Sequence, residues 1–161
     1  MFFGKSKIIN TRNNIINIIY GGNDQMSEKK QYSMVVFSNH TKGLEREYLE
    51  WYAGQHIHDL LRIPGYVGCK FYELSDKQLS EGEQKYKYMI IWDIETDDID
   101  SVTKEIKRRM DDGSTVFIPA FDSAYFDVTM SPITKYVTSK EIEGKSVEEV
   151  LEISELNKFV F

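Results

Sequence analysis

Two of the three histidines in the chain, His56 and His58, lie two residues apart, beside a tyrosine and an aspartate in the stretch WYAGQHIHDLL. An imidazole beside a tyrosine and an aspartate can act as a general acid or base, because its ordinary pKa lies near neutrality. In that case Asp59 would orient His56, and Tyr52 would donate a hydrogen bond to an oxyanion that develops on the substrate. The predicted catalytic residues are therefore His56, Asp59 and Tyr52.

The same cluster also has a purely structural interpretation. Histidine, aspartate and tyrosine are ordinary polar residues near helix ends, so His56 could simply satisfy its own hydrogen bonds there. A metal site would need His56 and His58 on one side, but residues two apart on a helix point in nearly opposite directions. The chain has no C-x-x-C and no H-x-x-x-H pattern. We therefore expect no metal ligands and no cofactor at this position.

A helix over about residues 44–61 must position the cluster. Each residue of a helix advances about 100° around the axis. By this spacing, the face that should turn towards a sheet carries Tyr48, Tyr52, Gln55 and Asp59, with His56 at its edge. Gly54 is unfavourable inside a helix, so we expect a bend or a loosened turn there.

The rest of the chain alternates between strand and helix patterns. Residues 32–38, 66–74, 86–94 and about 124–130 are rich in β-branched and aromatic side chains and predict four strands. In the second run, Val67, Cys69 and Phe71 are expected on one face. A second helix is predicted from apolar residues at helical spacing; Asp97 or Asp98 can cap its start, and Gly113 marks its end. The order β-α-β-β-α-β predicts an α+β, ferredoxin-like unit with an antiparallel sheet.

Both faces of the predicted sheet are apolar. In the third run Ile90 and Trp92 alternate with Met89 and Ile91. The two helices of one unit cover one face only, and a sheet with two apolar faces must bury the second one as well. We therefore expect a twofold homodimer in which two sheets meet as a barrel.

Three segments are predicted along the chain: an N-terminal arm at residues 1–31, the folded domain at 32–138, and a C-terminal extension at 139–161. Residues 1–31 are rich in Asn, Lys, Gly and Ser, which is typical of a polar arm. In the extension, Ser146 and Glu149 have the spacing of a capping box ahead of a short helix.

Composition excludes several classes of partner. The net charge of -6 and the isoelectric point of about 5.1 argue against nucleic acid. No run approaches the roughly 18 apolar residues that a membrane span requires. A single cysteine, Cys69, and the lack of an export signal at the N-terminus favour a reducing cytoplasm. We expect Cys69 to be a small buried residue.

The predicted first helix and the turn after it also resemble a known sequence pattern. The matching residues, in chain order, are Gly43, Glu45, Glu47, Tyr48, Trp51, Tyr52, His56, Asp59, Pro64, Gly65 and Tyr66. In this order they resemble the EthD-like family of dimeric α+β barrel proteins, over about residues 34–137. The chain departs from the pattern at His58, where the family has proline, and residues 1–31 and those after about 139 are additions.

The resemblance implies a homodimer with a ligand cleft between sheet and helices in each subunit, and it favours a functional role for His56. Related proteins of the superfamily include cofactor-free oxygenases, haem degraders, polyketide cyclases, decarboxylases, isomerases and proteins without an established activity. The fold therefore does not select a reaction. A cleft lined by aromatic side chains would suit a planar, mostly apolar ligand. The predicted ligand-binding residues are Tyr48, Trp51, Tyr72, Tyr88, Trp92 and Phe126.

The predicted function is that of a small cofactor-independent enzyme that moves protons on an aromatic, lactone or polyketide-like carbonyl compound. Cyclases, isomerases, decarboxylases and lyases do chemistry of this kind. One alternative is a non-catalytic ligand-binding or accessory protein of a catabolic or biosynthetic pathway. Another is a haem-binding or cofactor-free monooxygenase, in which His40, His56 or His58 would have to be the haem ligand.

Overall fold

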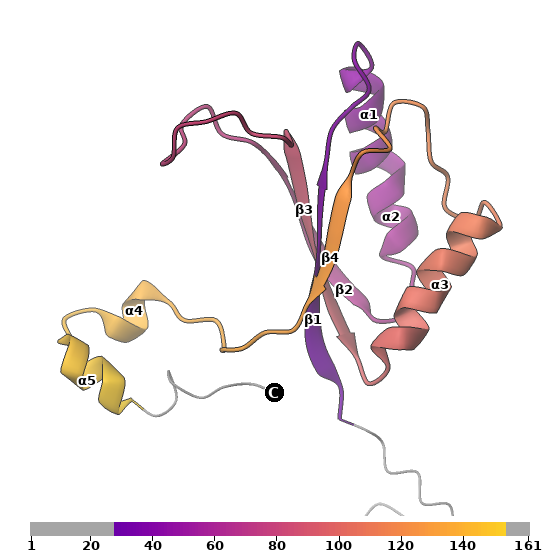
Figure 1. Cartoon of the computed structure of the whole chain (residues 1–161). Coiled ribbons are helices and arrows are strands. Elements are labelled where there is room, and N and C mark those ends of the chain that lie inside the picture. Colours follow the sequence, from indigo (N-terminus) through magenta and orange to yellow (C-terminus); the bar gives the residue numbers. More distant parts are fainter. Residues whose placement is uncertain (1–27, 154–161) are drawn as a thin grey trace, which may run out of the picture.

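The computed structural model describes residues 28–153, and its centre is a four-stranded antiparallel sheet. The strands are β1 (Lys30–Ser38), β2 (Tyr66–Glu73), β3 (Tyr88–Thr96) and β4 (Phe126–Met130), and they lie in the order β2-β3-β1-β4. Helices α1, α2 and α3 all lie on one side of this sheet (Figure 1). The predicted α+β arrangement β-α-β-β-α-β is therefore confirmed.

The first helical segment is continuous but not uniform. It runs through α1 (Glu45–Trp51), a π-helical turn η1 (Tyr52–His56) and α2 (Ile57–Leu60). Gly54 lies inside the π-helical turn, where the loosened turn was predicted. A π-helical turn takes up one more residue than an α-helical turn, so every later residue is rotated around the axis.

This rotation changes which side chains face the sheet. Gln55 was expected on the sheet side, and this expectation is wrong, because Gln55 is exposed. His56 occupies the inward position instead, with only 5% of its surface exposed. A uniform helical wheel fails here because the wider turn shifts the spacing from Tyr52 onwards.

The second helix, α3 (Ile99–Asp111), begins and ends close to the predicted signals. The Asp98 side chain accepts a hydrogen bond from the backbone N–H of Ser101 at 3.1 Å, which caps the helix. The chain leaves the helix through Gly113, whose φ of 76° is in the left-handed region that favours glycine.

The core lies between these helices and the sheet. Along β3, the side chains of Tyr88, Ile90, Trp92 and Ile94 alternate inwards and are buried. The aromatic side chains of the first helix, including Tyr48 with no exposed surface, pack onto them. Cys69 is half-buried at the edge of this core, and desolvation raises the pKa of its thiol.

Strand β2 contains an irregularity that was not predicted. Its register with β3 shifts between Tyr66 and Gly68, so that Val67 is an extra residue. Val67 is therefore 63% exposed, and the expectation that it shares the inner face with Cys69 and Phe71 is wrong. Simple alternation fails at this position because the bulge adds one residue.

The second face of the sheet turns away from α1, α2 and α3, and most of its side chains are apolar. We call it the open face, and its apolar members are Val35, Phe37, Tyr72, Met89, Ile91, Phe126, Val128 and Met130, as the strand registers show. The same registers place Ser33, Lys70 and Asp93 on this face. Phe126 and Met130 are 49% and 54% exposed. The expectation of a sheet with two apolar faces is confirmed.

The C-terminal segment contains two short helices, α4 (Ser139–Ile142) and α5 (Val147–Glu152). Both begin with a capping box, formed by Thr138 with Glu141 and by Ser146 with Glu149. The helix predicted after Ser146 is confirmed, and α4 was not predicted. In Figure 1 both helices lie away from the sheet, on the side opposite α3.

The predicted N-terminal arm lies largely outside the described residues, and β1 begins within its last two positions, at Lys30. Between residues 28 and 153, no helix has both the length and the apolar character needed to cross a membrane.

Candidate functional site

A small cavity of about 100 Å³ lies between the first helix, α3, the loop that follows α3, and the inner face of the sheet. Its lining consists of Met34, Val36, Tyr52, His56, Leu60, Trp92, Ile106, Met110, Thr115, Phe117, Phe121, Tyr125 and Asp127. Met110, Phe117 and Tyr125 are also partly on the protein surface, so the cavity reaches close to solvent on that side. It is the cavity that contains His56.

A larger hollow of about 670 Å³ lies where β1 begins and where the chain leaves β4. Residues 28–31, Ser131 and Ile133, all exposed, form most of its wall. Its lining contains no histidine or cysteine. The smaller cavity is therefore the better candidate site, because its chemical groups are buried and closely packed.

His56 is enclosed by aromatic rings. Its ring centroid lies 4.5 Å from that of Trp51, 5.0 Å from that of Tyr52 and 5.4 Å from that of Phe117. This burial lowers the pKa of His56 to about 4, and the charge of Asp59 opposes the shift only in part. At neutral pH the imidazole is therefore uncharged and can accept a proton.

Three buried polar atoms of the cavity lining have no hydrogen-bond partner. They are Nδ1 of His56, Nε1 of Trp92 and Oγ1 of Thr115. Within residues 28–153 the only other side-chain atom of this kind is Nδ1 of His40. A buried donor or acceptor without a partner destabilises a protein by about 1–3 kcal/mol, so such atoms are rare and need an explanation. Their presence around one cavity makes it a candidate site for a polar partner, which can be a water molecule or a group of a ligand.

Tyr52 is the second predicted catalytic residue that lines the cavity. Its ring stacks on Phe71, with 4.5 Å between the centroids and 9° between the planes. Burial raises the pKa of its phenol well above the usual range. Tyr52 therefore keeps its proton and can serve as a hydrogen-bond donor.

No hydrogen bond joins the side chains of Asp59 and His56, although the charge of Asp59 acts on the imidazole. Its carboxylate accepts a hydrogen bond from Nη1 of Arg62 at 3.5 Å, and its backbone carbonyl accepts one from Nη1 of Arg109 at 3.4 Å. The imidazole Nδ1 of His56, in contrast, has no partner. The structure thus does not show the predicted orienting contact, because the rotation after the π-helical turn leaves Asp59 beside α3. Asp127, on β4, is the acidic residue of the cavity lining.

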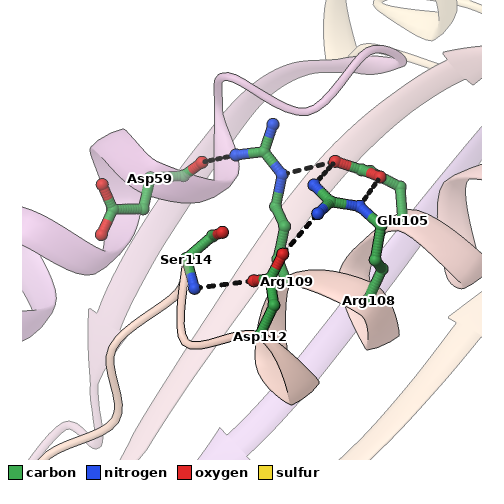
Figure 2. A network of polar contacts seen from close by, with 6 residues as sticks. All are labelled: Asp59, Glu105, Arg108, Arg109, Asp112 and Ser114. Carbon is green, nitrogen blue, oxygen red and sulfur yellow. Dashed lines mark hydrogen bonds and ion pairs between the residues drawn. The ribbon is translucent and has the colours of Figure 1, made fainter.

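The contact of Asp59 belongs to a polar network that holds α2 against the end of α3 (Figure 2). Nε of Arg109 donates to Oε1 of Glu105 at 2.7 Å, and Arg108 pairs with the same carboxylate and with Asp112. These arginines lower the pKa of Glu105 to about 2. The network fixes the end of α3, from which the loop with Thr115 and Phe117 departs.

Of the six predicted ligand-binding residues, only Trp92 lines the cavity. Tyr48, Trp51 and Tyr88 are buried structural residues. The Tyr48 hydroxyl lies 2.8 Å from Oγ of Ser38, Trp51 Nε1 donates to the carbonyl of Val116 at 2.9 Å, and the Tyr88 hydroxyl donates to Glu45 at 2.6 Å.

Tyr72 and Phe126 lie on the open face of the sheet, opposite the cavity. Tyr72 is paired with Met89, and Phe126 with Phe37, with which it also stacks. Tyr72 and Tyr88 were expected in one cleft, but they point to opposite faces because β2 and β3 pair Tyr72 with Met89 rather than with Tyr88.

No family model matches the chain, and no curated protein matches it. A solved structure described as an ethyl tert-butyl ether d (ethd) family protein from Bacillus halodurans c-125 aligns with 61% of this chain and 96% of its own length, at 16% identity and a TM-score of 0.41. The chain is structurally similar to an EthD family protein. The match contains no information on activity, which must be inferred from the chain's own residues.

Several residues of the EthD-like pattern have structural roles. Glu45 forms an ion pair with Lys87 and accepts the hydroxyl of Tyr88, and these contacts lower the pKa of Glu45 to about 2. Gly65 has a φ of 101°, and a Cβ at this position would lie 3.0 Å from Cγ2 of Val102. Glu45 therefore joins the first helix to β3, and Gly65 permits a tight approach of β2 to α3.

The sequence did not predict most of the cavity lining. Thr115, Phe117 and Phe121 come from the loop between α3 and β4, where no regular spacing shows which side chains point inwards. Asp127 could have been found, because it alternates with Phe126 and Val128 and must therefore face the helices.

The structure offers no grouping that would hold a metal. Among residues 28–153, no cluster of three or more His, Cys, Asp or Glu side chains has suitable positions. His58 is exposed, on the opposite side of the helix from the buried His56.

Proposed function

We propose that the cavity binds a small, mostly apolar carbonyl or phenol compound and that His56 accepts a proton from it without a cofactor. The observation that supports this proposal most is the buried, uncharged imidazole of His56, whose Nδ1 has no partner inside a cavity with aromatic walls. Isomerases, cyclases, decarboxylases and lyases that act beside a carbonyl group all need such a base.

In the proposed reaction, an imidazole nitrogen of His56 takes a proton from the carbon next to the carbonyl. The electrons of the broken C–H bond move onto the carbonyl oxygen, and the hydroxyl of Tyr52 donates a hydrogen bond to that oxygen. The proton then returns from the imidazolium to the same or another position. Since the pKa of His56 is only about 4, transfer requires that hydrogen-bond donors stabilise the oxyanion strongly.

A protein that binds such a compound without transforming it is the second candidate. Two observations favour it: the low pKa of His56, which makes it a weak base, and the cavity volume of about 100 Å³. Pockets for drug-sized ligands typically measure roughly 300–1,000 Å³. The cavity at His56 therefore fits a small compound or one end of a larger one, and it is too small for haem.

Hydrogen–deuterium exchange tests the proposed proton transfer. Cyclopentanone in deuterium oxide should exchange its α-hydrogens faster with the protein than in buffer alone, as followed by NMR. His56→Gln should lower the protein-dependent rate by about a hundredfold, the typical scale for a positioned acid or base. Asp59→Asn and His58→Ala should leave this rate within about twofold, because neither side chain lines the cavity.

An unchanged exchange rate in His56→Gln would refute the catalytic assignment. Binding of cyclopentanone by the wild-type protein without faster exchange would instead support the second candidate, a binding protein.

We also propose that the open face pairs with the same face of a second copy, so that the two sheets form a barrel. The support is the group of apolar side chains that all four strands contribute to this face, together with its position opposite α1, α2 and α3 (Figure 1). A lone sheet with such a face would leave a contiguous apolar surface in water, which monomeric proteins rarely do.

Replacement of Val35 by Glu tests the dimer. Val35 lies on β1, between Ile91 and Val128 on the neighbouring strands, so a carboxylate there would be buried without a partner in the dimer. We expect light scattering to show a wild-type dimer and a Val35→Glu monomer at micromolar concentration. The control Leu49→Glu places the same charge on α1, outside the open face, and should remain dimeric. A monomeric wild-type protein would contradict the proposal.

A further inference from the structure

We propose that Trp92 and Thr115 form a pair of hydrogen-bond donors that selects ligands with an uncharged acceptor oxygen, either carbonyl or phenol. This inference rests on the proposed binding function of the cavity and specifies its ligand class. Both side chains line the cavity, and the polar atom of each is enclosed without a partner.

Trp92 provides the more rigid of the two donors. Its side chain has no exposed surface and packs edge-on against Tyr66, with 5.5 Å between ring centroids, and against His56, at 6.3 Å. The indole N–H can donate a hydrogen bond but cannot accept one. Whatever pairs with Trp92 must therefore present an acceptor atom.

A backbone hydrogen bond fixes the position of Thr115. Its N–H donates to the carbonyl of Arg109 at 3.0 Å, which ties it to the last turn of α3. Only 3% of its surface is exposed. Its hydroxyl is therefore a second buried donor, and because it can also accept, it can pair with the hydroxyl of a phenol as well as with a carbonyl oxygen.

The charge of the surroundings disfavours an anionic ligand. Asp127 lines the same cavity from its solvent-exposed side, and its carboxylate would repel a ligand carboxylate, although less strongly than a buried carboxylate would. His56 is uncharged at neutral pH and offers no compensating positive charge. An uncharged oxygen suits both donors and avoids the repulsion.

The pair should act mainly by rejecting ligands without oxygen. An apolar molecule would displace any water from the cavity and leave the two donors unpaired, which is unfavourable for buried polar groups. Sites built to hydrogen-bond a substrate group discriminate strongly against analogues that lack it.

Phenol and toluene provide a matched pair of probes, because they have nearly the same shape and differ in one hydroxyl group. Titration calorimetry should show that the wild-type protein binds phenol at least about tenfold more tightly than toluene. Thr115→Val, which keeps the shape but removes the hydroxyl, should reduce this preference by about fivefold. Thr115→Ser keeps the hydroxyl and should preserve it. Trp92→Phe should also reduce the preference by about fivefold.

Equal binding of phenol and toluene, or a preference that persists in both Thr115→Val and Trp92→Phe, would overturn the inference. So would a wild-type protein that binds neither probe. Because valine has nearly the same shape as threonine, Thr115→Val should fold. The inference can therefore be tested even if Trp92→Phe does not fold. A wild-type protein that accelerates cyclopentanone exchange but shows no preference for phenol would count against the donor pair alone. A wild-type protein with a clear preference for phenol but no exchange would count against catalysis alone.

Discussion

Replacing Tyr48 by Ala should lower the free energy of unfolding by about 3–5 kcal/mol, the range for removing a large aromatic side chain from a core. Tyr48 has no exposed surface. Its ring centroid lies 4.9 Å from that of Tyr88 and 5.4 Å from that of Tyr52. The mutation would therefore leave a cavity where the first helix packs on the sheet.

Urea denaturation at a fixed protein concentration measures this loss. Tyr48→Phe should destabilise by only about 1 kcal/mol, because it keeps the ring and removes the hydrogen bond to Ser38. Tyr136→Ala is the matched control, since Tyr136 is 89% exposed, and should change stability by about 0.5 kcal/mol or less. A loss below about 1 kcal/mol for Tyr48→Ala would show that Tyr48 is not at the centre of the core.

The stability of the protein should rise with pH between about 4 and 6.5 because of His56. Its pKa is about 4 in the folded protein and near 6.5 in an unfolded chain, so the unfolded state binds more protons within this window. Acidification therefore favours unfolding, by on the order of 3 kcal/mol across the whole window. Above about pH 6.5 the effect of His56 on stability is constant.

Comparison with His56→Gln isolates this effect. Glu45 and Glu105 have pKa values of about 2, so their stabilising contribution is lost as the pH falls from about 4.5 towards 2 in both proteins. The difference in unfolding free energy between wild type and variant should change across pH 4–6.5 and remain flat above it. Parallel curves over this window would mean that His56 is not buried as described.

The order of strands and helices could be predicted because each element has its own periodicity. The alternation of Ile90 and Trp92 with Met89 and Ile91 fixes both faces of β3, and it led directly to the expected open face. Asp98 and Gly113 indicate the ends of α3. These signals are local, and tertiary contacts did not override them.

Irregular backbone limited the prediction of the site. The π-helical turn at Tyr52–His56 moved His56 inwards and Asp59 away from it, and Gly54 signalled only that some distortion would occur. The bulge at Val67 changed the faces at the start of β2. One added residue in a helical turn rotates the later side chains around the helix axis. One added residue in a strand changes the face of the sheet on which the neighbouring side chains lie.

The cavity-lining residues of the loop after α3 were not predicted from the sequence. Thr115 and Phe117 reach the cavity from a segment without periodicity, where tertiary contacts alone decide the direction of each side chain. Tyr48 and Tyr88 were correctly recognised as inward-facing aromatic residues, but sequence cannot separate a filled core position from a cavity wall. Trp92 was predicted as a ligand-binding residue and does line the cavity.

We infer that His56 is a buried, uncharged imidazole that contacts the ligand. Nitrogen-15 NMR of the histidine side chains, with and without phenol, tests it most directly. We predict that His56 keeps its neutral signals down to about pH 4, and that phenol shifts these signals while those of the exposed His58 stay unchanged. A His56 that titrates near pH 6.5, or whose signals do not respond to phenol, would contradict the account.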